Sequence, residues 1–170
     1  MTVAQAVTVT QVVVERFSLI SSRSFHDVLS TIEAAVGHPD IGGFWKQTSA
    51  AKDWGEVEQV VQAALGPAGL MQFASFDHGQ YLGKEWGAPG PRVMRIVAGN
   101  PLIMKEMARH VHDAGSYAPV TLLIDERPDG VHLSYDRMAS FLAPYGSEEA
   151  LKVARALDEK VEALLKKAAG

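Results

Sequence analysis

The chain has 170 residues, of which 47% are hydrophobic and 21% charged, and its formal net charge at pH 7 is -4. This composition is that of a soluble globular protein long enough to form one domain with its own core. The negative charge argues against a general nucleic-acid surface, which needs clustered Lys and Arg. The absence of cysteine excludes disulfides, iron–sulfur clusters, zinc–thiolate sites and thiol nucleophiles.

The amino terminus predicts neither a secretory signal nor a membrane span. The stretch from Met1 to Val14 is apolar and rich in Thr, but it lacks the basic start of a signal peptide. No run in the chain approaches the ~18–20 apolar residues that a membrane span requires. We therefore expect a cytoplasmic protein with neither a membrane nor a nucleic acid as its partner.

The first half of the chain predicts one strand and two helices. Apolar and polar residues alternate over 7–20, which is typical of a strand. A Ser cap and an apolar stripe predict a helix over 24–36. Residues 38–53 are expected to be irregular because they contain a Gly-Gly pair, and an Asp–Glu capping box predicts the next helix over 53–65.

The middle of the chain predicts two strands, a loop and a helix. The strands are expected over 70–76 and 92–98. The segment 79–91 between them holds four Gly and two Pro, so we expect a long loop there, and loops often carry function. A Met- and His-bearing helix is expected over 101–114.

The last part of the chain predicts a hairpin followed by helices. Strands over 119–126 and 131–136 flank a turn, a short helix is expected over 137–142, and a long helix over 147–168. This order of elements predicts a single α+β domain over 1–170. Its architecture would be a two-layer sandwich, with a mostly antiparallel sheet of about five strands covered by helices.

The segment Gly99-Asn100-Pro101 is the first candidate site. Asn is a good N-cap and Pro is favoured in the first helical turn, so the segment has a purely structural interpretation. A helix N-terminus also presents free N–H groups, which suit an anionic or carbonyl-bearing ligand. Arg92 and Arg95 lie just upstream, and we expect them to face the same spot.

The following helix and the preceding strand supply the other candidates. Met104 and Met107 have helical spacing, which is typical of core packing and also of adaptable pockets. His110 and His112 point about 200° apart on a helix and cannot bind one metal ion together, so we predict no metal site. His78 ends a strand at the mouth of the Gly-rich loop, where an imidazole can act as a capping group, a ligand or a general acid.

Three strings together resemble a known family. They are Gly99-Asn100-Pro101, the strand Ala118–Glu126, and Asp129-Gly130 followed by Leu133-Ser134-Tyr135. In order and spacing they are similar to domain-of-unknown-function family 302 (DUF302), over about Phe17 to Leu142, with the C-terminal helix as an extension. The resemblance implies a two-layer sandwich similar to the half-domain of TATA-binding-protein-like folds, often a homodimer, and it carries over no catalytic residue.

Three functional hypotheses follow. The preferred one is a small-molecule-binding domain with a pocket between the sheet and helix 101–114, covered by the loop 77–91 as a lid. Its expected contacts are His78, Arg95, Asn100, Met104, Met107, His110 and Tyr135. The second is a haem- or metal-dependent enzyme in which His78, His110 or His112 is the ligand, with haem as the leading candidate cofactor. The third is a non-catalytic dimeric interaction protein that uses the edge of its first strand.

Overall fold

The computed structural model describes residues 7–170, and over these residues it forms one five-stranded antiparallel sheet. The strand order is β1-β5-β4-β3-β2, with β1 over Arg16–Ser21, β2 over Met71–Asp77, β3 over Val93–Gly99, β4 over Val120–Arg127 and β5 over Gly130–Asp136. The helices are α1 (Phe25–Ala35), α2 (Ile41–Ala50), α3 (Trp54–Ala64), α4 (Gly79–Trp86), α5 (Pro101–Ala108), α6 (Ala114–Tyr117), α7 (Met138–Leu142), the 3-10 turn η1 (Ala143–Tyr145) and α8 (Glu148–Ala169). The predicted α+β class and antiparallel sheet are confirmed.

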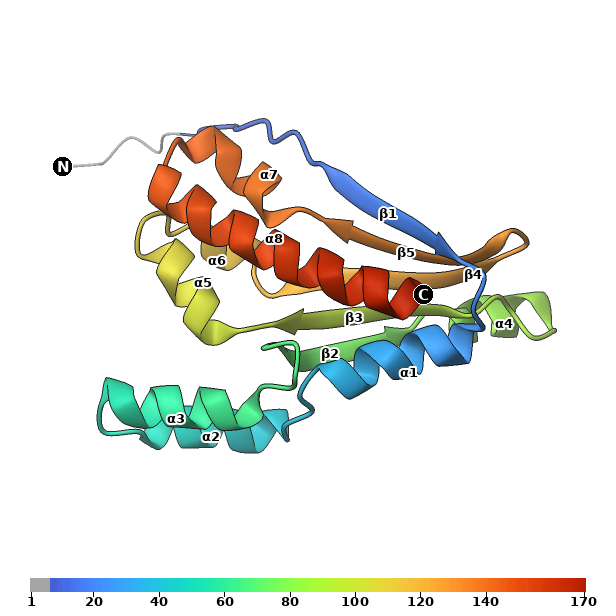
Figure 1. Cartoon of the computed structure of the whole chain (residues 1–170), viewed down its shortest axis with the longest axis horizontal. Coiled ribbons are helices and arrows are strands. Elements are labelled where there is room, and N and C mark those ends of the chain that lie inside the picture. Colours follow the sequence, from blue (N-terminus) through green and yellow to red (C-terminus); the bar gives the residue numbers. More distant parts are fainter. Residues whose placement is uncertain (1–6) are drawn as a thin grey trace.

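Helices α1 and α8 lie across one face of the sheet (Figure 1). Helix α8 also packs against α5 and α7 at one end of the sheet, whereas α4 lies at the opposite end of β3 from α5. The hairpin of α2 and α3 packs beside β2, around the small buried cluster of Phe44, Val61 and Met71. The sheet thus has one face under α1 and α8, and we call the other the open face.

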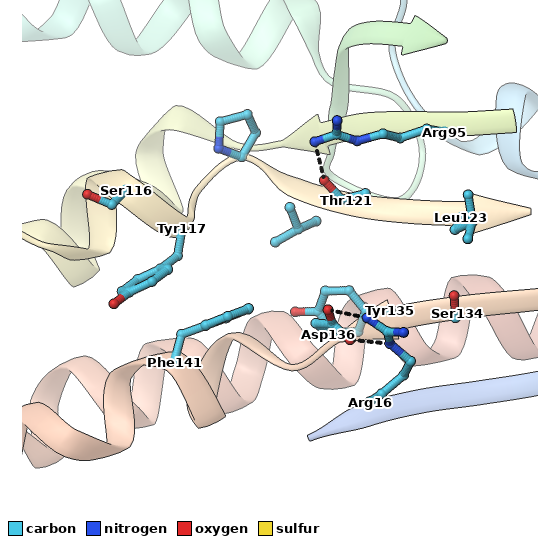
Figure 2. Close-up of a pocket in the computed structure, with 12 residues that line it drawn as sticks. Arg16, Arg95, Ser116, Tyr117, Thr121, Leu123, Ser134, Tyr135, Asp136 and Phe141 are labelled. Atoms are coloured by element: carbon cyan, nitrogen blue, oxygen red, sulfur yellow. Dashed lines mark hydrogen bonds and ion pairs between the residues drawn. The ribbon is translucent and has the colours of Figure 1, made fainter. Parts of the chain in front are cut away.

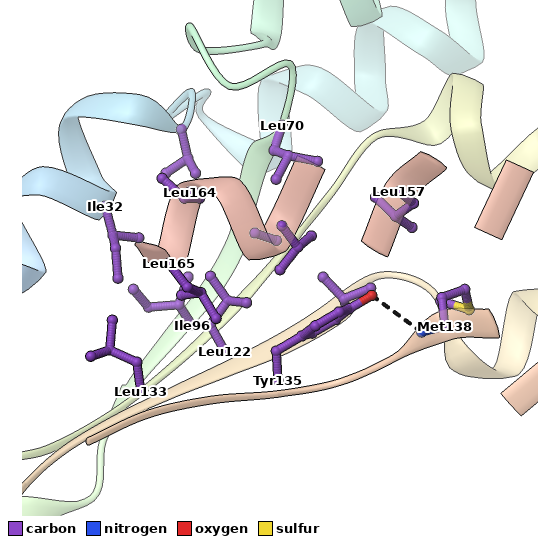
Figure 3. Packing of buried hydrophobic residues seen from close by; sticks show 14 of the residues in the cluster. Ile32, Leu70, Ile96, Leu122, Leu133, Tyr135, Met138, Leu157, Leu164 and Leu165 are labelled. Atoms are coloured by element: carbon purple, nitrogen blue, oxygen red, sulfur yellow. Dashed lines mark hydrogen bonds between the residues drawn. The ribbon is translucent and has the colours of Figure 1, made fainter. Parts of the chain in front are cut away.

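The main core fills the space between the sheet and the helices α1 and α8 (Figure 3). It follows the predicted alternation of the hairpin, in which Leu122 pairs with Tyr135 and Ile124 with Leu133. All four side chains are buried. Burial of each such aliphatic side chain contributes about 1.5–3 kcal/mol, which fixes the register and leaves the alternate residues of β4 and β5 on the open face.

A buried carboxylate connects α8 to the start of α7. Asp158, which is 5% exposed, accepts hydrogen bonds from the Tyr135 hydroxyl at 2.6 Å, the Met138 amide at 2.7 Å and the Ala139 amide at 3.1 Å. The two amides belong to the first turn of α7, so the carboxylate acts as its cap from another helix. Burial raises the pKa of the Asp158 carboxyl, and the three donated hydrogen bonds oppose that rise. The buried phenol has a raised pKa as well, first through burial and then through the carboxylate beside it.

Two glycines bring the ends of α1 and α3 into backbone contact. The amides of Gly37 and Gly66 both donate to the Leu70 carbonyl oxygen at 2.9 Å. A Cβ at position 37 would lie 1.9 Å from the Ala64 carbonyl oxygen, and one at position 66 would lie 2.3 Å from the Val36 carbonyl carbon. Only glycine fits at such a crossing. The segment that contains α2 and α3 therefore begins and ends at one point, where its two backbone ends are in contact.

The expected first strand over 7–20 is wrong in its first half. Only Arg16–Ser21 forms β1, and the side chains of Val7, Val9 and Val13 are more than 80% exposed. The reason is the partner strand: Arg16 pairs with Asp136, the last residue of β5, after which the chain turns into α7. The alternating residues before Arg16 therefore have no residues of β5 opposite them with which to form strand hydrogen bonds.

Three expectations about helices also need correction. Residues 38–53 contain α2, because Asp40 caps it through the Gly43 amide at 2.9 Å and Phe44 is buried, which offsets the cost of two glycines in its first turn. Residues 79–91 contain α4 rather than a continuous loop. The helix expected over 101–114 ends at Ala108, and a tighter turn carries the chain into α6.

Candidate functional site

The junction of β3 and α5 borders a partly open cavity of about 230 Å³, which we call the inner cavity. It is lined by Trp45, Phe73, Gly99, Asn100, Pro101, Met104, Met107, Ala118, Pro119, Val120 and Leu157. These residues come from α2, β2, the end of β3, α5, the start of β4 and α8. The inner cavity therefore lies where a pocket between the sheet and the helix at 101–114 is expected.

Asn100 contributes a polar side chain to this lining. Its amide oxygen and its amide nitrogen each form a hydrogen bond within the fold. Its Oδ1 accepts from the Leu102 amide at 2.9 Å, and its Nδ2 donates to the Gly69 carbonyl oxygen at 3.0 Å. The first bond is an N-cap of α5, and the second ties α5 to the turn before β2. Asn100 thus shapes the cavity, and each of its two polar atoms already has one partner in the fold.

A second concave site, the open-face cleft, lies on the opposite side of the sheet from α8 (Figure 2). Its volume is about 440 Å³. It is lined by Arg16, Arg95, Ser116, Tyr117, Pro119, Val120, Thr121, Leu123, Ser134, Tyr135, Asp136 and Phe141. Four strands or strand ends form its floor, and the region of α6 and α7 forms a wall at one end.

The two guanidinium groups of the open-face cleft differ in their partners: one is in an ion pair and the other is not. Arg16 forms a two-pronged ion pair with Asp136, at 2.7 and 2.9 Å, which raises the pKa of the guanidinium through hydrogen bonding. Arg95 donates only to the Thr121 hydroxyl, at 3.3 Å, and its guanidinium carbon lies 5.7 Å from the ring centre of Phe76. Within residues 7–170, Arg95 forms no ion pair, whereas Arg16 is neutralised.

An aromatic wall closes one end of the open-face cleft. Tyr117 and Phe141 stack with ring centres 4.8 Å apart and an angle of 13° between their planes. The Tyr117 hydroxyl lies 3.0 Å from that of Tyr145, a bond that raises the pKa of the Tyr145 phenol together with the nearby Asp113. The paired rings are therefore fixed in orientation and form an aromatic boundary at this end of the cleft.

The structure divides the seven predicted contact residues among several places. Asn100, Met104 and Met107 line the inner cavity, and Arg95 and Tyr135 line the open-face cleft. The phenol of Tyr135 is 1% exposed and bonds to Asp158, so it belongs to the core.

The arginines do not converge on the N-terminus of α5 as expected. Arg92 lies before β3, over the ring of Phe25, and forms an ion pair with Glu126, while Arg95 points to the open face. The expected lid is also wrong for the inner cavity, because α4 and the turn after it lie at the far end of β3 (Figure 1).

The histidines are scattered over the molecule. His78 lies at the end of β2 with its ring stacked on Phe76, whereas His110 and His112 are exposed after α5. The described residues line neither cavity with a histidine, and over 7–170 no three His, Asp or Glu side chains form a group suited to a metal ion. Ligation of haem by one of these imidazoles stays a prediction without support from the geometry.

Comparison with solved structures places this fold among known ones. The chain is similar to the crystal structure of an uncharacterised conserved DUF302 protein from Bacillus stearothermophilus, with a TM-score of 0.62 over 90% of this chain and 97% of that one. Sequence identity is 10%, so this likeness concerns the fold. A search of curated proteins found no match.

The sequence itself matches the family model described as domain of unknown function DUF302, over residues 45–168. The chain therefore belongs to the DUF302 family, as its motifs indicate. The matched range includes α8, which the sequence interpretation treats as an extension beyond a core of 17–142. Along the part of the chain that the structure describes, no helix has the length and apolar character needed to cross a membrane.

Proposed function

We propose that this protein binds a small uncharged apolar molecule, or the apolar end of a larger one, in the inner cavity. The observation that carries the proposal is a partly open cavity whose lining is almost entirely carbon and sulfur, beside the junction of β3 and α5 that Asn100 caps. Six of its residues are Trp45, Phe73, Met104, Met107, Val120 and Leu157.

The size of the inner cavity limits the ligand. Cavities for drug-sized ligands measure roughly 300–1,000 Å³, and an apolar cavity of about 150 Å³ binds benzene. At about 230 Å³ the inner cavity lies between these cases. It suits one substituted ring or a short branched chain.

The chemistry of the lining limits the ligand further. Met104 and Met107 carry soft, flexible thioethers that adapt to an apolar guest. The lining holds no charged side chain, and the two polar atoms of Asn100 already bond to Leu102 and Gly69, so a charged ligand would lose its hydration without gaining an ion-pair partner. Transfer of an apolar group from water to such an apolar lining is favourable.

Toluene is a suitable first probe, measured by its effect on thermal unfolding. At a free concentration ten times its Kd, toluene should raise the Tm of the protein by about 3–6 °C, because it binds the folded state and not the unfolded one. A second readout is the fluorescence of Trp45, which becomes the single Trp after Trp54→Phe and Trp86→Phe. That fluorescence should change saturably, because the indole lines the cavity.

Two alanine substitutions form a matched pair for this test. Ala118→Leu adds three carbon atoms inside the inner cavity and should abolish the toluene response, whereas Ala156→Leu adds them on the exposed side of α8 next to Leu157 and should preserve it. The proposal fails if wild type shows no response. It also fails if Ala118→Leu responds as strongly as Ala156→Leu.

A further inference from the structure

We infer that the open-face cleft is a second ligand site, separate from the inner cavity, which binds a small organic carboxylate with a flat aromatic body. Two features of the cleft carry this inference. They are the guanidinium of Arg95, which has no carboxylate partner within residues 7–170, and the aromatic wall of Tyr117 and Phe141.

The charges of the cleft favour an anion. Its lining holds two guanidinium groups, Arg16 and Arg95, and one carboxylate, Asp136, so one positive charge is in excess. The carboxylate is held by both prongs of Arg16, so it does not compete for Arg95. The next carboxylate on this face of β4, Asp125, is paired with Arg127. A positive site on a chain with a net charge of -4 is a local departure that attracts an anion.

The guanidinium of Arg95 is also positioned for recognition. It lies over the Phe76 ring and donates to the Thr121 hydroxyl, and both contacts limit its rotamers. Since that single donated bond uses one of five N–H groups, the others can bind both oxygens of a carboxylate. Preorganisation of this kind lowers the entropy lost on binding.

The rest of the cleft suits the body of such a ligand. The stacked rings of Tyr117 and Phe141 lie at one end, and Leu123 contributes an apolar floor beside the Ser134 hydroxyl (Figure 2). Offset stacking between rings is favourable beyond the area that it buries. At about 440 Å³ the cleft accommodates a two-ring carboxylate, which the inner cavity, at about 230 Å³, suits less well.

The test compares 1-naphthoate with its neutral analogue 1-naphthamide, using calorimetric titration of the full chain. Wild type should bind naphthoate at least about tenfold more tightly than naphthamide, since a charge-assisted hydrogen bond is roughly twice as strong as a neutral one. Amide chemical shifts of Thr121, Leu123 and Ser134 should change, while those of Met104 and Met107 should not. The last comparison separates this site from the inner cavity.

Arg95→Gln and Arg155→Gln form the matched pair of variants. Both arginines are exposed, but only Arg95 lines the cleft, and Arg155 lies on α8 across the sheet from it. Arg95→Gln should remove the preference for naphthoate, Arg155→Gln should retain it, and Tyr117→Leu should weaken both ligands. The inference is overturned if wild type does not distinguish the two ligands, if naphthoate does not bind at about 1 mM, or if Arg95→Gln keeps the preference.

Discussion

Removal of the buried carboxylate by Asp158→Ala should strongly destabilise the fold. The carboxylate accepts from the Tyr135 hydroxyl and from the amides of Met138 and Ala139, at 2.6, 2.7 and 3.1 Å. In the variant, the Met138 amide keeps the Tyr135 oxygen at 3.2 Å, but the Ala139 amide and the phenol lose their partner. A buried group left without a partner costs about 1–3 kcal/mol, and hydrogen bonds to charged groups contribute more than neutral ones. We expect a loss of about 3–5 kcal/mol, a large part of a typical folding free energy.

Urea unfolding followed by far-UV circular dichroism at pH 7 measures this loss. The slope of the free energy of unfolding against urea should stay constant, so that the change in midpoint reports stability. Glu159→Ala is the matched control, because its carboxylate is on the same helix but exposed, and it should change stability by less than about 0.5 kcal/mol. A loss below about 1 kcal/mol in Asp158→Ala would refute the view that this carboxylate caps α7.

Three further outcomes are expected. The raised pKa of Tyr135 means that, above the ordinary phenol pKa of about 10, the unfolded chain ionises first and stability falls by about 1.4 kcal/mol per pH unit. Urea unfolding should give a lower free energy of unfolding at about pH 11 than at about pH 8 in wild type, and a smaller difference between the two pH values in Tyr135→Phe. Equal differences in the two proteins would contradict the raised pKa of Tyr135. Asp53→Ala should cost about 1 kcal/mol, because the Glu56 amide loses its cap at 3.0 Å, and an unchanged urea midpoint would oppose this. Gly37→Ala should cost about 2–3 kcal/mol through contact with the Ala64 carbonyl, and a variant as stable as wild type would show that the crossing relaxes freely.

The elements predicted best are those whose signals lie within a few residues. The caps at Ser24, Asp53 and Ser147 begin α1, α3 and α8, with each side chain accepting from an amide three residues on. The hairpin of β4 and β5 has the expected inward faces, led by Leu122 and Leu133. Caps and alternation are local physical effects, so a single sequence contains the information that they need.

The errors arise where a local signal depends on distant partners. Alternation over 7–15 resembles a strand, yet no strand is available to pair with it. The glycines of α2 and α4 predict loops, but capping by Asp40 and burial of Phe44 outweigh their cost in α2. In α4 the N-cap residue His78 makes no such bond, but the Asp77 carboxylate accepts from the Gln80 amide in the first turn at 3.2 Å.

The candidate site is predicted in part for the same reason. Asn100, Met104 and Met107 are near one another in sequence, so their shared place beside the inner cavity is visible as a pattern. Trp45 and Leu157 complete that cavity from far along the chain, and only the fold brings them there. The open-face cleft was missed because its alternate polar residues, such as Thr121 and Ser134, have the pattern of an ordinary solvated face.

The close approach of Gly37 and Gly66 brings together the two ends of the segment that contains α2 and α3. Both amides meet at the Leu70 carbonyl oxygen, so a chain lacking 38–65 would need only a short splice there to leave α1 and β2 where they are. Such a deletion would remove Trp45 and uncover one side of the inner cavity while sparing the cleft on the other face. The two proposed sites therefore differ in construction: the α2–α3 hairpin supplies part of the lining of the inner cavity, whereas the strands of the sheet form most of the cleft.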